Sequence, residues 1–148
     1  MDPCAFIDDD GQAYLYFGGA YKAAIVKLKS DMVTRDGPIQ LLDIPQYYEG
    51  IWIHKRQDTY YASYPCRPEG SDANKMLYST APTPFGPWTL RREILDNHSH
   101  NIHGSITSFK NRDYVFFHIQ GPSRWERKVC VEEISYSKDG KISLTEKL

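Results

Sequence analysis

The hairpin pattern that decides the fold is first seen in residues 5–17, which read AFIDDDGQAYLYF. A short apolar segment leads into a polar turn, and a segment rich in Tyr and Phe follows. Asp-Gly between apolar runs is the sequence signature of a tight β-hairpin turn. Residues 51–61 (IWIHKRQDTYY) and 106–117 (ITSFKNRDYVFF) follow the same plan. The sequence therefore predicts three hairpins of one design.

The spacing of these hairpins indicates how they are assembled. The first Tyr of each second strand is Tyr14, Tyr60 or Tyr114, and these lie 46 and 54 residues apart. A β-repeat of roughly 40 to 50 residues is typical of a propeller blade, whose middle strands are buried on both faces. We predict an all-β chain of three blade-like units, at approximately residues 2–48, 49–100 and 101–148. A β-sandwich with three unrelated hairpins is the alternative.

Composition excludes several classes of function. The 148 residues include 18 Lys and Arg against 19 Asp and Glu, with a formal net charge of −1. This balance lacks the positive charge of a nucleic-acid-binding protein, so no nucleic-acid partner is expected. No apolar run is long enough to span a membrane. We also see no basic segment followed by an apolar one, so no secretion signal is predicted within the chain, and the compartment is left open.

Three local patterns have structural rather than chemical interpretations. Ala24 to Lys29 alternates apolar and polar residues at its end, which favours a half-exposed strand over a helix. The chain has three cysteines, an odd number, and they show no C-x-x-C spacing: Cys4, Cys66 and Cys130. We therefore expect them to be small buried hydrophobic residues rather than a disulfide framework or a zinc site. The acidic run from Asp8 to Gly11 lacks the remaining ligand spacing of a calcium loop and is predicted to be a turn.

A polar residue precedes each hairpin. Asp2, Glu49 and His103 occupy this position in the first, second and third units. The innermost strand of every propeller blade runs along the central channel, so residues at its entry converge on one axis. Two carboxylates and an imidazole in one cleft are suited to general acid–base chemistry on a sugar.

Aromatic residues surround the second of these positions. Tyr47 and Tyr48 precede Glu49, and Trp52 follows it closely. We expect Tyr48 and Trp52 to contact substrate, because flat aromatic walls suit sugar rings. Such walls also desolvate a carboxyl group, and desolvation raises the pKa of a carboxyl group toward the range that a proton donor needs.

Each polar position has a simpler interpretation. Asp2 can be a solvated end of the chain, Glu49 an exposed turn carboxylate and His103 a structural histidine. His98, His100 and His103 also suggest a metal site, although a turn rich in Asn and His is as often only a loop. No metal site is therefore assigned from the residues alone.

The ordered motifs resemble family 43 glycoside hydrolases, the five-bladed β-propeller group that contains β-xylosidases, α-L-arabinofuranosidases and arabinanases. The resemblance covers almost the whole chain. It is carried by Asp2-Pro3, Phe6 to Gly11, Tyr14 to Gly19, Lys27-Leu28, Asp31-Met32, Tyr48 to Arg56, Tyr60-Tyr61, Pro84 to Trp88, Ile94 to Asn97, His103 to Ile106 and Arg127 to Glu132.

The resemblance implies a role for each matching residue. Glu49 matches the general acid, and Asp2 matches a second-blade aspartate that adjusts the acid's pKa. His103 matches a fourth-blade channel histidine that contacts a central water or calcium ion. Arg127 matches a fifth-blade arginine near the carboxylates, and Trp52 is expected beside the acid. No cofactor is required, and calcium is possible at His103 through water.

One departure from the family pattern concerns the catalytic base. The base is a first-blade aspartate upstream of the segment that Asp2 resembles, and this sequence contains no such residue. The chain thus resembles the C-terminal part of a catalytic domain, with roughly three of five blades. An incomplete propeller exposes the faces of its end blades, so a missing N-terminal half or another copy of the chain is expected as a partner.

Two functions follow as hypotheses. The first is an inverting glycoside hydrolase acting on xylose- or arabinose-containing plant polysaccharides or oligosaccharides, with the base supplied from outside this chain. The second is a non-catalytic remnant that binds carbohydrate or nothing. A related propeller hydrolase with another substrate is a third possibility, against which the Glu49 to Trp52 context argues.

Overall fold

The chain folds into three antiparallel sheets that follow one another along the sequence. The computed structural model describes residues 2–70, 74–123 and 125–145. Sheet A comprises β1 (Cys4–Ile7), β2 (Ala13–Gly19), β3 (Lys22–Leu28) and β4 (Gln40–Leu42). Sheet B comprises β5 (Trp52–Arg56), β6 (Thr59–Cys66), β7 (Lys75–Ala81) and β8 (Thr89–Leu95). Sheet C comprises β9 (Ser105–Phe109), β10 (Arg112–Gln120), β11 (Arg127–Tyr136) and β12 (Ile142–Leu144).

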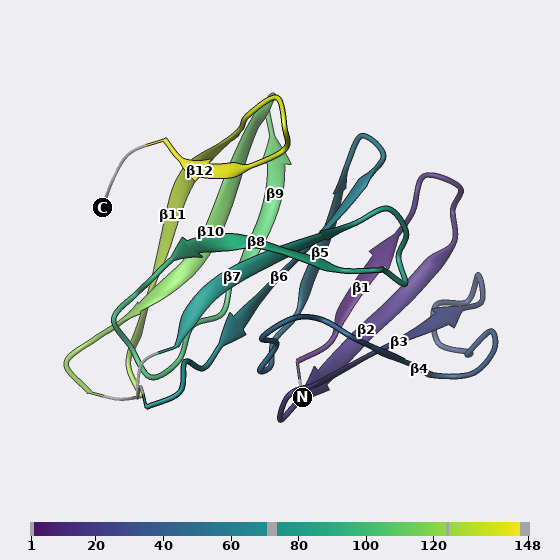
Figure 1. Cartoon of the computed structure of the whole chain (residues 1–148), viewed down its shortest axis with the longest axis horizontal. Coiled ribbons are helices and arrows are strands. Elements are labelled where there is room, and N and C mark those ends of the chain that lie inside the picture. The colour runs from purple at the N-terminus through teal and green to yellow at the C-terminus, as the bar shows by residue number, and fades with distance from the viewer. Residues whose placement is uncertain (1, 71–73, 124, 146–148) are drawn as a thin grey trace.

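Each sheet is a simple meander in which every strand pairs with the next one along the chain (Figure 1). The first strands of the three sheets are neighbours, because β1 contacts β5 and β5 contacts β9. This arrangement confirms the predicted all-β, incomplete propeller, and the β-sandwich alternative is wrong. The described residues contain no helix, and hence no helix that could cross a membrane.

Sheet B is the centre of the packing because both of its faces are covered. Along β6, Tyr60 and Tyr64 pack with residues of sheet A, whereas Tyr61 packs with residues of sheet C. Successive side chains of a strand point to opposite faces, so a strand that is buried along most of its length and rich in Tyr can pack against two sheets at once. The Tyr64 hydroxyl is satisfied by the Pro45 carbonyl at 2.7 Å and by Ser79 Oγ at 2.6 Å.

The acidic turn of the first hairpin also joins two sheets. Gly11 N donates to the Asp8 carbonyl at 2.9 Å, and Gly11 has a φ of +84°, which confirms the predicted turn. The Asp8 carboxylate accepts a hydrogen bond from Lys55 Nζ at 2.7 Å and another from the Tyr60 hydroxyl. Lys55 and Tyr60 both belong to sheet B, so this turn fixes sheet A against its neighbour.

Two of the smaller sequence predictions can be compared with the structure directly. Residues 24–28 lie in β3, so this segment is the predicted strand rather than a helix. Cys4 and Cys66 are buried free thiols, as expected, and burial raises the pKa of both. Cys130 is also free but only partly buried. The prediction of a buried residue is therefore wrong at Cys130, which lies on the less covered sheet C.

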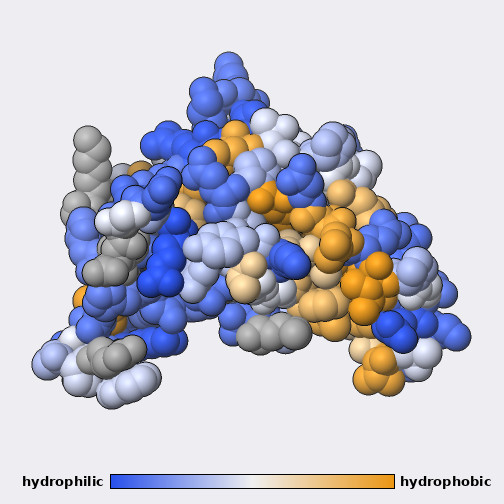
Figure 2. Space-filling view, turned by 60° about the horizontal axis from the view of Figure 1, so that its bottom comes forward, coloured by the Kyte–Doolittle hydropathy of each residue, from blue (hydrophilic) through white to orange (hydrophobic). Residues whose placement is uncertain are grey.

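The outer face of sheet A is apolar. Leu15 and Phe17 point away from sheet B and pack around a small cluster with Val26. Ile7 and Leu41 on the same face are 59% and 77% exposed. Figure 2 shows hydrophobic residues gathered on the side of the molecule where Figure 1 places sheet A. An apolar surface of this kind is typical of a site that another protein segment covers.

Sheet C has a similar outer face. Phe116 lies opposite Val131 in the β10–β11 register, and both are exposed. Val129, two residues before Val131 and therefore on the same face, is 83% exposed. The two end sheets thus present apolar faces, whereas both faces of sheet B are covered.

Candidate active site

Glu49 lies in the loop between β4 and β5, directly before the innermost strand of sheet B. Tyr48 N in this loop donates to the Pro65 carbonyl at 3.1 Å, which holds the loop against β6. Gly50 then adopts a φ of +57°, a left-handed conformation that glycine adopts without steric cost. This turn directs the chain into β5 and leaves the Glu49 side chain 27% exposed.

His103 reaches the same place from the start of sheet C. Its Nε2 lies 3.7 Å from Glu49 Oε1, and its side chain is 28% exposed. The imidazole rests on Gly50, where an added Cβ would come within 2.4 Å of His103 Nδ1. The absence of a side chain at Gly50 is therefore what allows His103 to approach Glu49, although 54 residues separate the two in sequence.

Asp2 is connected to this region through Tyr47. The Tyr47 side chain is buried, and its hydroxyl has no hydrogen-bond partner among the described residues. Burial raises the pKa of Tyr47, and the charges of Asp2 and Glu49 raise this pKa further. Both carboxylates are thus near enough to act on one hydroxyl. Asp2 itself is exposed and does not line the pocket described next.

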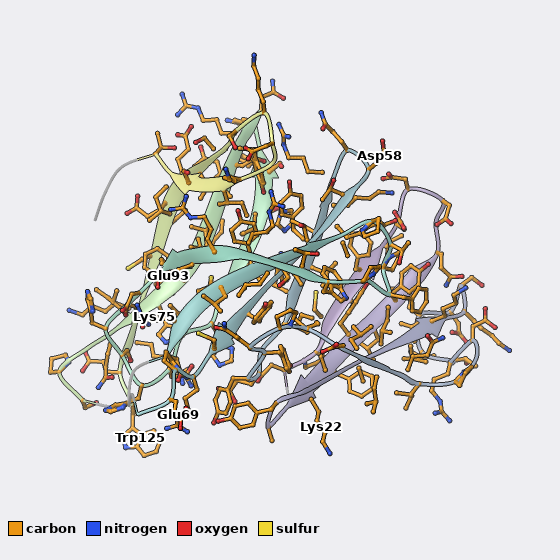
Figure 3. The ribbon with its side chains drawn as sticks, viewed as in Figure 1. Lys22, Asp58, Glu69, Lys75, Glu93 and Trp125 are labelled. Carbon is orange, nitrogen blue, oxygen red and sulfur yellow. The ribbon has the colours of Figure 1, made fainter. Side chains whose placement is uncertain are left out.

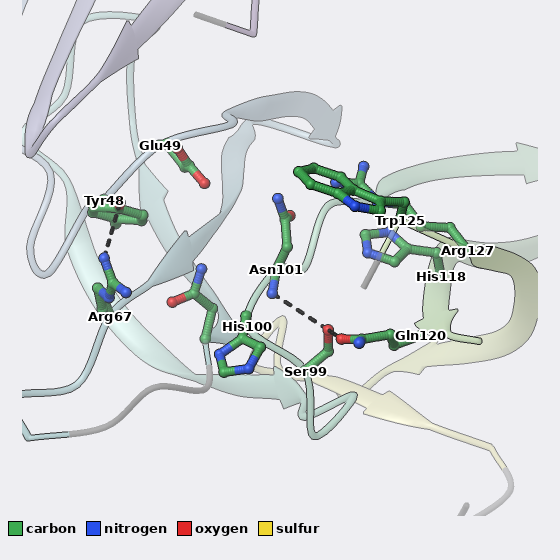
Figure 4. A pocket seen from close by; sticks show the side chains of 11 residues that line it. Tyr48, Glu49, Arg67, Ser99, His100, Asn101, His118, Gln120, Trp125 and Arg127 are labelled. Carbon is green, nitrogen blue, oxygen red and sulfur yellow. Dashed lines mark hydrogen bonds between the residues drawn. The ribbon is translucent and has the colours of Figure 1, made fainter. Parts of the chain in front are cut away.

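A pocket of about 280 Å³ opens beside Glu49, between the loops of sheets B and C (Figure 4). Glu49 is the one carboxylate among its described lining residues, and most of the others carry amide, imidazole, hydroxyl or guanidinium groups. The lining residues are Tyr48, Glu49, Arg67, Asn74, Ser99, His100, Asn101, His118, Gln120, Trp125 and Arg127.

Arg127 lines this pocket from the first position of β11. The expectation that Arg127 and His103 belong to different blades is wrong, because β9 and β11 are strands of the same sheet. Between them lies His118, which is 8% exposed. Burial lowers the pKa of His118, and the nearby Arg127 and His103 lower this pKa further. The His118 imidazole is therefore neutral at pH 7.

Tyr48 and Trp52, the two predicted sugar contacts, have different positions. Tyr48 lines the pocket, and its hydroxyl accepts a hydrogen bond from Arg67 Nη1 at 3.3 Å. Trp52 does not line the pocket, because its indole Nε1 donates to the Ile106 carbonyl at 2.9 Å. Trp52 instead fills the space between sheets B and C and borders a separate hollow beside the inner strands. The structure thus gives Trp52 an interface position away from the expected sugar contact.

Seven pocket residues were not identified from the sequence: Arg67, Asn74, Ser99, Asn101, His118, Gln120 and Trp125. All lie in loops or at strand ends, where no periodic pattern marks them. The one available signal was proximity in sequence, since residues 97–101 directly precede His103.

The described residues do not form a metal site by themselves. No group of three or more His, Cys, Asp and Glu side chains in these parts of the chain could hold a metal ion. Calcium takes six to eight oxygen ligands. Next to His103 the pocket offers a single carboxylate, that of Glu49, so the possible calcium ion at His103, bound through water, stays a prediction.

Comparison with known proteins places this geometry in a family. The arabinoxylan arabinofuranohydrolase of Paenibacillus polymyxa is 30% identical over 97% of this chain and 27% of its own length. The β-xylosidase of Xylanibacter ruminicola is 28% identical over 96% of this chain and 57% of its own. The chain therefore spans about a quarter to three fifths of these curated relatives.

Solved structures show the same fold over nearly the whole chain. An α-L-arabinofuranosidase from Clostridium thermocellum matches with a TM-score of 0.85 and 32% identity, over 99% of this chain and 53% of its own. A β-xylosidase/α-arabinofuranosidase from a compost microbial metagenome, described as a calcium-free form in complex with xylotriose, matches with a TM-score of 0.87 and 26% identity, over 97% and 58%. The family model described as glycosyl hydrolases family 43 matches residues 1–142, and the chain belongs to this family.

Proposed function

We propose that this chain supplies the proton-donating part of the active site of an inverting glycoside hydrolase. The substrates that we infer are xylose- or arabinose-containing glycans, since relatives of both kinds are similar to the chain. The observation that carries the proposal is the meeting of Glu49 and His103 at 3.7 Å beside a polar pocket. A half-exposed carboxyl group in such a position can reach a bound glycosidic oxygen.

In this proposal Glu49 protonates the oxygen of the leaving sugar as the glycosidic bond breaks. His103 is a positioning residue, because its ring lies against both Gly50 and the carboxylate. Asp2 and Arg127 act at longer range through their charges, Asp2 from the side of Tyr47 and Arg127 from the side of His118. Tyr48 forms part of the wall that contacts the sugar.

An inverting glycosidase also needs a second carboxylate, roughly 6.5–9.5 Å from the first, to activate water. Glu49 is the one residue with a carboxylate among the described residues that line the pocket. We infer that the base comes from the part of the propeller that this chain does not cover, packed against the apolar outer face of sheet A. The chain covers 53% and 58% of two solved relatives, which leaves length for further sheets in those proteins.

The proposal is tested by supplying a small carboxylate in place of the missing base. Xylotriose and arabinotriose are incubated with the chain with and without sodium formate, and the released pentose is measured. We expect release that depends on formate and falls by at least about a hundredfold in Glu49→Gln, because general acid catalysis contributes 10²–10⁴-fold. Glu69→Gln is the matched control, since Glu69 is an exposed carboxylate that lies on the same side of the molecule as Trp125 of the pocket (Figure 3).

Two other outcomes would count against the proposal. Hydrolysis without formate that Glu49→Gln abolishes would show that the base is already present in the chain. Formate-dependent hydrolysis that is unchanged in Glu49→Gln would show that Glu49 is not the acid. Sugar binding without any turnover would favour the second candidate, a non-catalytic carbohydrate-binding chain. The lack of a second carboxylate among the described pocket residues is the observation that supports this candidate.

A further inference from the structure

Another pocket lies between sheets B and C, at the ends of their strands that are farthest from Glu49. Its volume is about 310 Å³. Glu49 comes before β5, whereas Arg56 of this pocket is the last residue of β5, so the length of that strand, about 13 Å, separates the two. Figure 3 shows Asp58, from the hairpin tip that follows Arg56, at the opposite end of the molecule from Trp125. The lining residues are Arg56, Gln57, Thr59, Tyr61, Thr80, Arg91, Lys138, Asp139 and Gly140.

Positive charge gathers on the wall of this pocket from three separate segments. Arg56 ends β5, Arg91 lies in β8, and Lys138 lies in the turn between β11 and β12. None of the three forms an ion pair with a carboxylate of the described residues. The chain as a whole has a formal net charge of −1, so this concentration of unpaired cations is a local feature.

The one carboxylate among the described lining residues, that of Asp139, is already engaged. Its Oδ2 lies 2.8 Å from Lys141 Nζ, and its Oδ1 accepts a hydrogen bond from Ser137 Oγ at 2.5 Å. These two contacts lower the pKa of Asp139 to about 2, so the carboxylate is charged and is paired with a lysine outside the pocket lining. The pocket therefore keeps an excess of positive charge.

The turn between β11 and β12 is held against sheet B by two hydrogen bonds. The Tyr61 hydroxyl donates to the Gly140 carbonyl at 3.0 Å. Arg91 Nη2 donates to the Asp139 carbonyl at 3.3 Å. Burial raises the pKa of Tyr61, and the charges of Arg56 and Arg91 both oppose this change, so both guanidinium groups lie near one hydroxyl. The wall is thus arranged before any ligand arrives, which lowers the entropic cost of binding.

The groups on this wall select a ligand that accepts hydrogen bonds. Arginine and lysine side chains are donors only, whereas an ionised carboxylate or a phosphate group offers acceptors. The hydroxyl groups of Thr59 and Thr80 and the amide of Gln57 can hydrogen-bond the rest of such a ligand. Tyr61 is the one aromatic residue among the described lining residues, and it is 2% exposed. No ring face is therefore open to stack on a neutral sugar.

We propose that Arg56, Arg91 and Lys138 form a binding site for an oxyanion, the carboxylate or phosphate group of a small molecule. The guanidinium groups donate to its oxygens, and the ammonium group of Lys138 adds a third positive charge. The site goes beyond the proposed function and does not depend on it, because Glu49 and His103 are not among its lining residues. Both sheets that form the site belong to this chain, so the site needs no further part of a propeller.

Calorimetric titration of the chain at low ionic strength with sodium phosphate, sodium glucuronate and glucose tests this proposal. Glucuronate and glucose have similar rings and differ in the carboxylate, so their comparison isolates the negative charge. We expect at least one of the two anions to bind with a Kd of about 10 mM or tighter, and glucose not to bind detectably. The anion that binds more tightly identifies the source of the oxyanion. Sodium chloride at about 0.2 M should weaken the binding severalfold by screening.

Variants separate this site from general attraction between charges. Arg91→Gln should weaken anion binding about tenfold, because hydrogen bonds between charged groups are the strong ones. Lys138→Gln should weaken it about threefold. Arg92→Gln is the matched control and should change the affinity less than twofold, because Arg92 is the next residue of β8 but lines a different pocket. All three side chains are exposed, so the unfolding temperature without ligand should change little.

Several results would overturn the proposal. Equal effects of Arg91→Gln and Arg92→Gln would reduce the interaction to general charge attraction. Binding of glucose as strong as that of glucuronate would do the same for the anion, and so would the absence of binding of both anions. A loss of binding in Arg127→Gln with no change in Arg91→Gln would place the anion in the pocket beside Glu49. A failure of the proposed function is a different result, because turnover that is unchanged in Glu49→Gln has no bearing on these titrations.

Discussion

Acid conditions should loosen the interface between sheets B and C through His54. The ring of His54 stacks on Tyr61 with centroids 4.9 Å apart, and His54 Nε2 shares a hydrogen bond of 2.8 Å with the Tyr136 hydroxyl. Burial lowers the pKa of His54 to about 4, and the charge of Asp113 opposes this change. In the unfolded chain the pKa of a histidine is about 6.5. The unfolded chain therefore binds more protons between these values, and acid favours unfolding.

The magnitude follows from the difference between the two pKa values. Full linkage gives a loss of about 2 kcal/mol in the free energy of unfolding between pH 7 and pH 5. Part of the ring remains in contact with water, so we expect about 1–2 kcal/mol at pH 5. His54→Phe keeps a ring against Tyr61 but cannot be protonated. This variant should be less stable at pH 7, because the Tyr136 hydroxyl loses its partner, and its stability should change less with pH.

Urea unfolding at pH 7, 6 and 5, followed by tryptophan fluorescence, measures this difference. The free energy of unfolding of His54→Phe should still depend on pH, but less steeply, because burial also lowers the pKa of His118. His98→Asn is the control: the His98 side chain is 88% exposed, and asparagine tolerates its positive φ. The reasoning is refuted if His54→Phe loses stability between pH 7 and pH 5 as steeply as the unmodified chain.

Three other predictions concern the site and the sheet faces. Gly50→Ala should lower the free energy of unfolding by about 1–2 kcal/mol, because alanine disfavours a left-handed φ. The added methyl group should also displace the His103 ring, which NMR of the imidazole can detect. A His103 ring that does not move would contradict the contact with Gly50. Replacing Ile7 and Leu41 by Lys should reduce self-association of the chain in sedimentation experiments, while the free energy of unfolding changes by no more than about 0.5 kcal/mol. Unaltered self-association would show that the outer face of sheet A is not the surface through which copies of the chain associate. Calcium chloride should leave the unfolding temperature of the chain unchanged relative to EDTA, since no group of three or more His, Cys, Asp and Glu side chains among the described residues could hold the ion. A rise with calcium would instead support the site expected at His103.

Much of the fold could be predicted from the sequence because the repeated hairpins carry strong local signals. The aromatic run of β6 and the turn at Asp8 each satisfy local and long-range requirements together. The short outer strands β4 and β12 have only three residues each and no distinctive pattern, so their pairing is decided by the strands beside them.

The candidate site was predictable to the extent that it depends on the repeat. Glu49 and His103 occupy equivalent positions in successive units, and the fold brings them together. Asn74 and Trp125 could not be found in this way, because no repeated pattern in the sequence marks their positions. The position of Trp52 was equally inaccessible, since alternation along β5 does not show that its indole finds the backbone carbonyl of Ile106.

The turn at Asp8 has a consequence for how the chain can vary. Hairpin tips usually tolerate inserted residues, because they project into solvent and contact little else. Here the tip carries a carboxylate that Lys55 and Tyr60 of the next sheet both require. Lengthening this loop would withdraw the carboxylate and leave two neighbouring donors unmatched. Relatives should therefore differ little in the length of this turn, and differences in loop length should accumulate at hairpin tips that contact no neighbouring sheet.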